Sequence, residues 1–138
     1  MTSDESEATT QKEKNLQTIL LVVDDDEDIG EFIAQALRDE TPYQVLHVTD
    51  AVRALESVNS IKPSLFILDY LLPGIDGLKL ADHLHSVEGL ETVPTVMMSA
   101  TFPSPKEMRK RKITFLSKPF DLNELLATVE KLLAEQKK

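Results

Sequence analysis

The chain alternates five times between a short apolar run and a longer stretch in which apolar residues recur every three or four positions. The first kind of segment is typical of strands, and the second is typical of helices that bury one face. Five such pairs predict an α/β fold, with a doubly wound parallel sheet and helices on both sides of it. The expected strands are 19–23, 43–48, 65–69, 95–98 and 113–116; the expected helices are 28–39, 51–58, 78–86, 105–112 and a last one after Asp121.

The helix expected over 105–112 should be the least stable of the five. Ser104-Pro105-Lys106-Glu107 has the form of a capping box with proline at the first helical position. The next strand starts at Ile113, so the helix is short, and Met108 is its one clear apolar residue. A helix that buries so little is held weakly.

The apolar run Leu65–Leu68 ends in a carboxylate, Asp69, and turn signals follow at Pro73-Gly74 and Asp76-Gly77. A strand without polar alternation is buried on both faces, and open α/β sheets bind ligands at the carboxyl ends of such strands. Asp69 is therefore the first candidate for chemistry, although a single acid at a strand end is more often only a turn residue.

Other strands also end in polar residues: Asp24 and Asp25 follow the first, Ser99 ends the fourth and Lys118 follows the fifth. The carboxyl ends of parallel strands share one edge of the sheet, so these side chains are expected to meet Asp69 there. Clustered carboxylates repel, and a divalent cation relieves the repulsion. Oxygen ligands favour Mg²⁺, and a lysine ammonium suits a phosphate. Singly, Ser99 fits a turn and Lys118 a solvated surface; jointly they indicate a phosphoryl-handling site.

The acidic run after the first strand allows other interpretations. Asp26–Asp28 are expected to stabilise the start of the following helix rather than to bind a ligand. A calcium-binding loop would need glycine where Ile29 stands and glutamate where Gln35 stands, so it is excluded. The histidines show no metal-site spacing and are assigned to the surface or to helix faces; they are His47, His83 and His85.

The overall charge limits the expected partners. The 138 residues carry a formal net charge of −9, which argues against direct nucleic-acid binding. There is no cysteine, and no apolar run approaches the roughly 20 residues of a membrane span, so a cytoplasmic location is expected. Residues 1–15 are polar and acidic and are expected to form a disordered tail before one domain, 16–138.

From about residue 18 to 133 the chain resembles the receiver domains of response regulators in two-component signalling, of the stand-alone single-domain type. The matching pieces are Val23-Asp24-Asp25, Leu68-Asp69 with Pro73 and Asp76-Gly77, Ser99-Ala100 and Lys118-Pro119-Phe120. The resemblance implies a flavodoxin-like, five-stranded sheet in the order 2-1-3-4-5, which places the first and third strands side by side. By the same resemblance Asp69 accepts a phosphoryl group, Asp25 binds Mg²⁺ directly and Asp24 binds it through water. The Leu71 carbonyl is the further metal ligand.

The resemblance also implies a signalling switch rather than an enzyme. A histidine kinase or phosphotransfer protein would donate the phosphoryl group, and Ser99 and Lys118 would each hold one of its oxygens. Ser99 would then turn toward that group and leave space for Phe115, the aromatic switch residue. The face formed by the helix 105–112, the strand after it and the last helix would change, and would control a downstream protein that the sequence does not identify.

The region around the helix 105–112 departs from the family pattern. Ser99 stands where threonine is commoner, Lys118 follows it by only 19 positions, and Lys112-Ile113 replaces the usual Gly-Ala. This stretch is also basic, with Glu107 as its one acid. The charges suggest a docking face for an acidic partner, although a solvated helix surface explains them equally well. The basic segment comprises Lys106, Arg109, Lys110, Arg111 and Lys112.

Two other functions fit parts of the sequence. One is a docking module that binds constitutively and whose phosphorylation is vestigial; the complete set of acids, hydroxyl and lysine argues against it. The other is a phosphatase with an aspartate nucleophile, which uses a similar sheet and needs a second aspartate two positions later, followed by threonine or valine. Residues 24–28 supply the acid pair, but Asp28 occupies the last position and no cap domain is evident.

Overall fold

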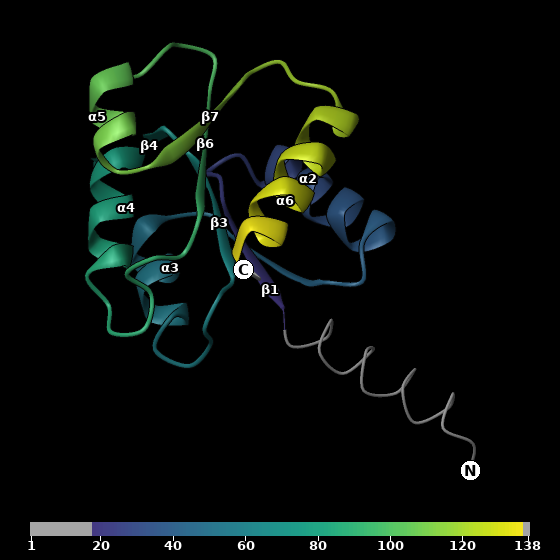
Figure 1. Cartoon of the computed structure of the whole chain (residues 1–138), viewed down its shortest axis with the longest axis horizontal. Helices are drawn as coiled ribbons and strands as arrows, with labels where there is room; N and C mark the ends of the chain where they lie inside the picture. Colours follow the sequence, from purple (N-terminus) through teal and green to yellow (C-terminus); the bar gives the residue numbers. More distant parts are fainter. Residues whose placement is uncertain (1–17, 137–138) are drawn as a thin grey trace.

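The computed structural model describes residues 18–136, and a five-stranded parallel sheet forms the middle layer of the molecule (Figure 1). The strand order is β2-β1-β3-β6-β7, which is the order 2-1-3-4-5 when the strands of this sheet are counted along the chain. This confirms the expected doubly wound α/β class. The strands are β1 (Ile19–Val23), β2 (Gln44–Val48), β3 (Leu65–Asp69), β6 (Thr95–Ser99) and β7 (Ile113–Ser117).

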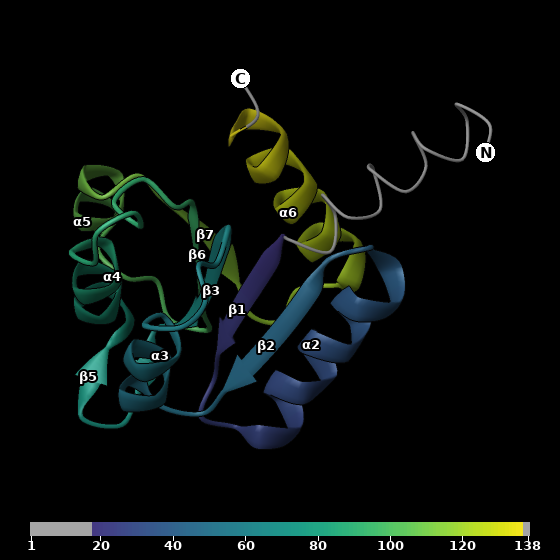
Figure 2. The ribbon, with the colours of Figure 1, turned by 90° about the horizontal axis from the view of Figure 1, so that it is seen from below.

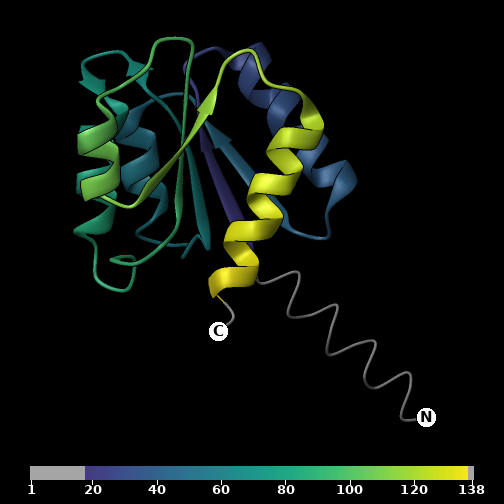
Figure 3. The same ribbon diagram turned by 45° about the horizontal axis from the view of Figure 1, so that its top comes forward.

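The helices cover both faces of the sheet. Helices α2 (Glu27–Glu40) and α6 (Leu122–Gln136) lie together on one side, and α3 (Ala51–Ser57), α4 (Gly77–His85) and α5 (Pro105–Lys110) lie on the other (Figures 1 and 3). Each lies close to its predicted position. No helix in residues 18–136 is both long and apolar enough to cross a membrane. The tail expected over residues 1–15 lies outside the described residues.

Strand β3 divides the core. Leu65 and Ile67 pack toward α2 and α6, whereas Phe66 and Leu68 pack toward α3, α4 and α5. All four are completely buried, as the unbroken apolar run predicts for a central strand. Strand β1 pairs with β3 and β2, and Figure 2 shows β1 and β2 running side by side. On its other side β3 pairs with β6, so the end of β3 with Asp69 lies between the ends of β1 and β6.

A short antiparallel hairpin, β4 (Leu71–Leu72) and β5 (Ile75–Asp76), separates β3 from α4 and was not expected. Two-residue strands are too short to show any hydrophobic period, although the Pro73-Gly74 turn between them was recognisable. Gly74 has a left-handed backbone, with φ of 79°. The hairpin returns the chain to the end of β3, where the Gly77 amide donates to the Tyr70 carbonyl at 2.8 Å.

Helix α5 is short and buries only Met108, as predicted, but it ends at Lys110 rather than at residue 112. Its predicted cap is present, because the Ser104 hydroxyl accepts the Glu107 amide at 3.3 Å. The helix ends where Lys112 adopts a left-handed backbone, with φ of 58°. That conformation suits glycine, so the lysine at this position holds the turn under strain.

Replacing Lys112 with glycine is expected to stabilise the protein by about 0.5–1 kcal/mol, since glycine adopts a positive φ without a Cβ clash. Urea denaturation should show a higher midpoint at an unchanged m-value. Arg109→Gly is the matched control: it lies on the exposed face inside α5 and is expected to destabilise by about 1 kcal/mol. A lower midpoint for Lys112→Gly would contradict the strain.

Candidate functional site

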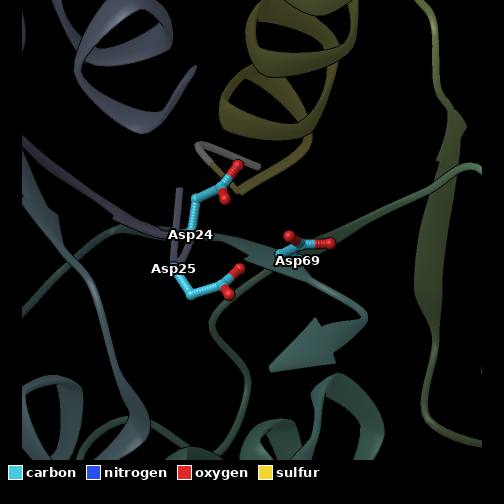
Figure 4. Close-up of side chains that lie close together, drawn as sticks. All are labelled: Asp24, Asp25 and Asp69. Atoms are coloured by element: carbon cyan, nitrogen blue, oxygen red, sulfur yellow. The ribbon is translucent and has the colours of Figure 1, made fainter. Parts of the chain in front are cut away.

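The three predicted carboxylates meet at one edge of the sheet. Asp24 and Asp25 directly follow β1, and Asp69 is the last residue of β3, its neighbour in the sheet. One oxygen from each of the three lies within 4.8 Å of the others (Figure 4). We call these three residues the acidic cluster. The convergence predicted from the ends of neighbouring parallel strands is confirmed.

Asp24 is the most deeply buried member of the acidic cluster. It is completely buried, and its Oδ1 accepts the Asp26 amide at 3.0 Å. Its Oδ2 has no hydrogen-bond partner, which makes it unlike every other buried side-chain nitrogen or oxygen in residues 18–136. A buried carboxylate oxygen without a hydrogen bond is costly unless a cation binds it closely, so this oxygen has the character of a ligand atom.

Lys118, after β7, brings a positive charge to the same edge. Its Nζ lies 3.6 Å from Asp24 Oδ2 and 3.5 Å from Asp69 Oδ2. The Lys118 amide donates to the Ser99 carbonyl at 2.9 Å, which ties the end of β7 to the end of β6. The side chain remains about a quarter exposed, so its ammonium reaches the cluster without being sealed from solvent.

The environment of Asp69 opposes its ionisation. Burial raises the pKa of the Asp69 carboxyl most strongly, and the Asp24 charge raises it further. The Lys118 ammonium and the Leu71 amide, which donates to the carboxylate, lower the pKa but do not reverse the shift. Burial, more than the neighbouring charge, therefore opposes the ionisation of Asp69, and a cation at the site would favour the ionised form. Leu71, whose carbonyl was predicted as the further metal ligand, is the first residue of β4, two positions after Asp69.

Ser99 is buried at the end of β6, beside the end of β3. Its hydroxyl lies 3.1 Å from the Thr101 hydroxyl and accepts the Thr101 amide, also at 3.1 Å. Thr101 thus holds Ser99 in a local turn. The sequence singled out Ser99 but did not predict this partner, because a hydroxyl two residues farther on has many possible roles in a loop.

Phe115, the predicted switch residue, lies in the middle of β7 and is partly buried. Its ring packs on Phe102, with ring centroids 4.6 Å apart and planes inclined at 56°. Phe102 is 66% exposed. Sequence reasoning missed Phe102, because an isolated aromatic residue in a loop has no periodic context.

The assignment of His47 to the surface is wrong. This residue was placed among surface histidines, but it lies on β2 with a side chain only 5% exposed, and its Nε2 is 3.0 Å from the Asp24 carbonyl oxygen. Alternation along an edge strand did not reveal that one of its side chains would be covered by α2. His83 lies exposed on α4, as expected.

Arg111 differs from the other members of the basic segment. Its guanidinium donates to both carboxylate oxygens of Asp82 on α4, at 2.7 and 3.0 Å, and to Glu107 Oε1 at 2.9 Å. These bonds lower the pKa values of both carboxyls. Arg111 therefore ties α5 to α4, whereas the other four cations are exposed: Lys106, Arg109, Lys110 and Lys112.

Replacing Arg111 with glutamine is expected to destabilise the protein at pH 7 by at most about 1 kcal/mol, because the Asp82 side chain is half exposed. A carboxyl whose pKa is lowered by folding stabilises the fold above its ordinary pKa of 3.8, and that stabilisation is lost as the pH falls through the lower folded value. The difference in urea midpoint between variant and wild type should therefore narrow below about pH 4. Arg109→Gln, on the same helix, should show no such pH-dependent difference.

Comparison with known proteins is consistent with this geometry. Residues 20–130 match the family model described as the response regulator receiver domain. The transcriptional regulatory protein YrkP of Bacillus subtilis is 34% identical over 110 residues, which are 80% of this chain and 47% of YrkP. The phosphate regulon transcriptional regulatory protein PhoB of Pseudomonas aeruginosa is 31% identical over 117 residues, 83% of this chain and 51% of PhoB. The chain thus spans about half the length of these relatives.

Solved structures show the same architecture. The chemotaxis response regulator CheY4 of Vibrio cholerae superposes with a TM-score of 0.76 at 22% identity, over 83% of this chain and 98% of CheY4; this likeness shows the fold alone. The receiver domain of the hybrid histidine kinase CckA superposes with a TM-score of 0.70 at 30% identity, over 83% of this chain and 98% of that domain.

Proposed function

The chain belongs to the response regulator receiver domain family, and from that premise we propose that it is a phosphoryl-accepting switch with Asp69 as the acceptor. One observation carries the proposal: the acidic cluster and the Lys118 ammonium converge at the carboxyl ends of β1, β3 and β7. Acids alone would fit many surfaces. Acids that include a buried oxygen without a hydrogen bond, together with a lysine 3.5 Å from the acceptor, suit a transferring phosphoryl group.

The donor set fits Mg²⁺. Its atoms are hard carboxylate oxygens, and the buried Asp24 Oδ2, which has no hydrogen bond, is available as a ligand atom. Asp24, Asp25 and Asp69 would hold the ion, with the Leu71 carbonyl as the family's further ligand. When bound, Mg²⁺ supplies positive charge beside the oxygens of the incoming phosphoryl group.

The protein's own residues perform the transfer. A carboxylate oxygen of Asp69 attacks the phosphorus of a phosphohistidine, the phosphorus–nitrogen bond breaks, and its electron pair remains on the donor's imidazole. The Lys118 ammonium, already 3.5 Å from Asp69 Oδ2, neutralises charge on a phosphoryl oxygen. The Ser99 hydroxyl now lies 3.1 Å from the Thr101 hydroxyl, and turning it toward another phosphoryl oxygen would break that contact and disturb the loop after β6.

The donor has a docking surface beside the site. A groove of about 420 Å³ lies between α2 and the segment after β7, and it is lined mostly by apolar side chains. Phe32 is 71% exposed and Ile29 is 46% exposed there. This groove suits an apolar helix of a histidine kinase or phosphotransfer protein. Its lining residues are Ile29, Phe32, Ile33, Ala100, Lys118, Pro119 and Phe120.

The downstream partner is proposed to bind the face of α5, β7 and α6. The four exposed cations of the basic segment suit an acidic surface. Arg111 is not part of this proposed docking face, because it already forms ion pairs with Asp82 and Glu107. A charge reversal of Arg109 and Lys110 that left the affinity for an acidic partner unchanged would contradict this assignment. Several relatives are named as DNA-binding regulators. We propose that this chain does not itself contact nucleic acid, because its net charge is −9.

The experiment that tests the proposed function is incubation with acetyl phosphate, with and without Mg²⁺, followed by intact-mass measurement. One added phosphoryl group that requires Mg²⁺ supports the switch. No phosphorylation at any Mg²⁺ concentration would favour the constitutive docking module. Sustained turnover of a panel of phosphate esters would instead favour the phosphatase.

A further inference from the structure

Residues of β2 contact both main-chain groups of Asp24, the residue that directly follows β1. The Asp24 amide donates to the Val48 carbonyl at 3.2 Å, as the next step of the parallel ladder. The ladder ends there, and the Asp24 carbonyl oxygen is met instead by a side chain, with His47 Nε2 at 3.0 Å. An imidazole thus takes the place of a ladder donor for the residue that carries the buried carboxylate.

Helix α2 packs against this imidazole at Gly30. A Cβ on Gly30 would lie 2.0 Å from His47 Nε2, so only a glycine at this position leaves space for the ring. On the other side of the ring, Glu31 Oε2 lies 3.6 Å from His47 Nδ1, and Arg38 binds Oε1 of the same carboxylate at 2.8 Å. Because a carbonyl oxygen can only accept, the hydrogen bond to Asp24 requires a proton on Nε2.

We propose that His47 is a positioning residue for the metal site: by donating Nε2–H to the Asp24 carbonyl, it orients the Asp24 carboxylate toward Asp25 and Asp69. The inference rests on the proposed function. The Asp24 carboxylate accepts one hydrogen bond, from the Asp26 amide to Oδ1, and its Oδ2 lies 3.6 Å from the Lys118 ammonium. Neither contact holds the Asp24 carbonyl, so the direction of the carboxylate also depends on how its backbone is held. Groups that hydrogen-bond to a metal ligand and hold it in place commonly cost 10- to 100-fold in metal affinity when they are removed.

The competing explanation is that His47 only fills space in the core. The Gly30→Ala variant distinguishes this packing role from the proposed positioning role. The added methyl displaces the imidazole from the Asp24 carbonyl but leaves His47 in the sequence, and alanine favours a helix interior more than glycine does. If His47 only fills space, this variant changes stability and leaves Mg²⁺ affinity alone. If His47 positions Asp24, Mg²⁺ affinity falls whichever way stability moves.

The experiment measures Mg²⁺ binding by isothermal titration calorimetry on the wild type, Gly30→Ala, His47→Leu and His47→Gln. Calorimetric melting without metal gives each variant's stability separately. We expect the Kd for Mg²⁺ to rise about tenfold in Gly30→Ala and in His47→Leu. His47→Gln, whose amide nitrogen can stand near the position of Nε2, should recover most of the affinity. The Gly30→Ala/His47→Leu double variant should bind no more weakly than His47→Leu, because both changes remove the same bond.

An unchanged Kd in Gly30→Ala and His47→Leu would overturn the inference, as would a glutamine variant as weak as the leucine variant. If His47→Leu does not fold, Gly30→Ala and His47→Gln still decide the question. Failure of the wild type itself to bind Mg²⁺ or to accept a phosphoryl group would instead count against the proposed function. The two failures are therefore distinguishable within one set of titrations.

Discussion

Asp69→Asn is expected to abolish phosphorylation by acetyl phosphate, at every Mg²⁺ concentration. A neutral amide is a poor nucleophile toward phosphorus, and the product acyl phosphate needs a carboxylate oxygen that asparagine lacks. The change preserves the shape of the side chain at the end of β3, so Lys118 and Asp24 should keep their positions. Intact-mass measurement after incubation should show one added phosphoryl group on the wild type and none on the variant.

Two comparisons make this result specific. Asp28→Asn removes an exposed acid from the first turn of α2, outside the acidic cluster, and should leave phosphorylation unchanged. The folded Asp69→Asn protein should be at least as thermally stable as the wild type, because one of three mutually repelling carboxylates is gone. Phosphorylation that persists in Asp69→Asn would show that another residue is the acceptor, and the assigned mechanism would be wrong.

Gly77→Ala is expected to destabilise the protein by about 2–3 kcal/mol, an overpacking effect at a site with no room to relax. A Cβ at this position would lie 2.4 Å from Met97 Sδ, 2.8 Å from the Asp69 carbonyl oxygen and 2.9 Å from the Tyr70 Cα. The methionine can move, but two of the three contacts are backbone. The substitution must therefore shift the start of α4 or the end of β3, and it should also slow phosphorylation at Asp69.

Gly74→Ala is the matched control for Gly77. Gly74 has φ of 79° and nothing within 4 Å of the added carbon, so its substitution strains the backbone without crowding a neighbour. We expect a loss of about 1 kcal/mol from that strain and normal phosphorylation. Urea denaturation of both variants, with phosphorylation rates measured in parallel, separates crowding from backbone conformation. Equal effects of the two substitutions on both measurements would refute the packing argument.

Much of the site could be predicted because each of its main residues ends or follows a strand. Asp24 and Asp69 meet as expected since β1 and β3 are hydrogen-bonded neighbours, and Lys118 reaches both. The helix caps could be predicted because they depend only on neighbouring residues: Asp26 and Ser104 accept hydrogen bonds from backbone amides three residues farther along the chain. Chemistry that depends on chain direction and local hydrogen bonding is visible in a sequence.

The errors share a different cause. His47 was misplaced because the cover that buries it comes from Gly30, on another element. Arg111 was grouped with the free cations because its partner Asp82 lies 29 positions away on α4. Neither the Gly30–His47 contact nor the Arg111–Asp82 ion pair produces a periodic pattern in the sequence. Contacts between separate elements depend on how the helices pack on the sheet.

The succession of strands and helices, their buried faces and the residues at the strand ends could all be predicted from the amino-acid sequence. Those features follow from hydrophobic period and backbone capping, which act over a few residues. The contacts between side chains could be seen only in the folded protein: His47 with the Asp24 carbonyl, Thr101 with Ser99, Phe102 with Phe115 and Asp82 with Arg111. Such hydrogen bonds, ion pairs and ring contacts form wherever close packing brings two groups together, and packing is a property of the whole fold.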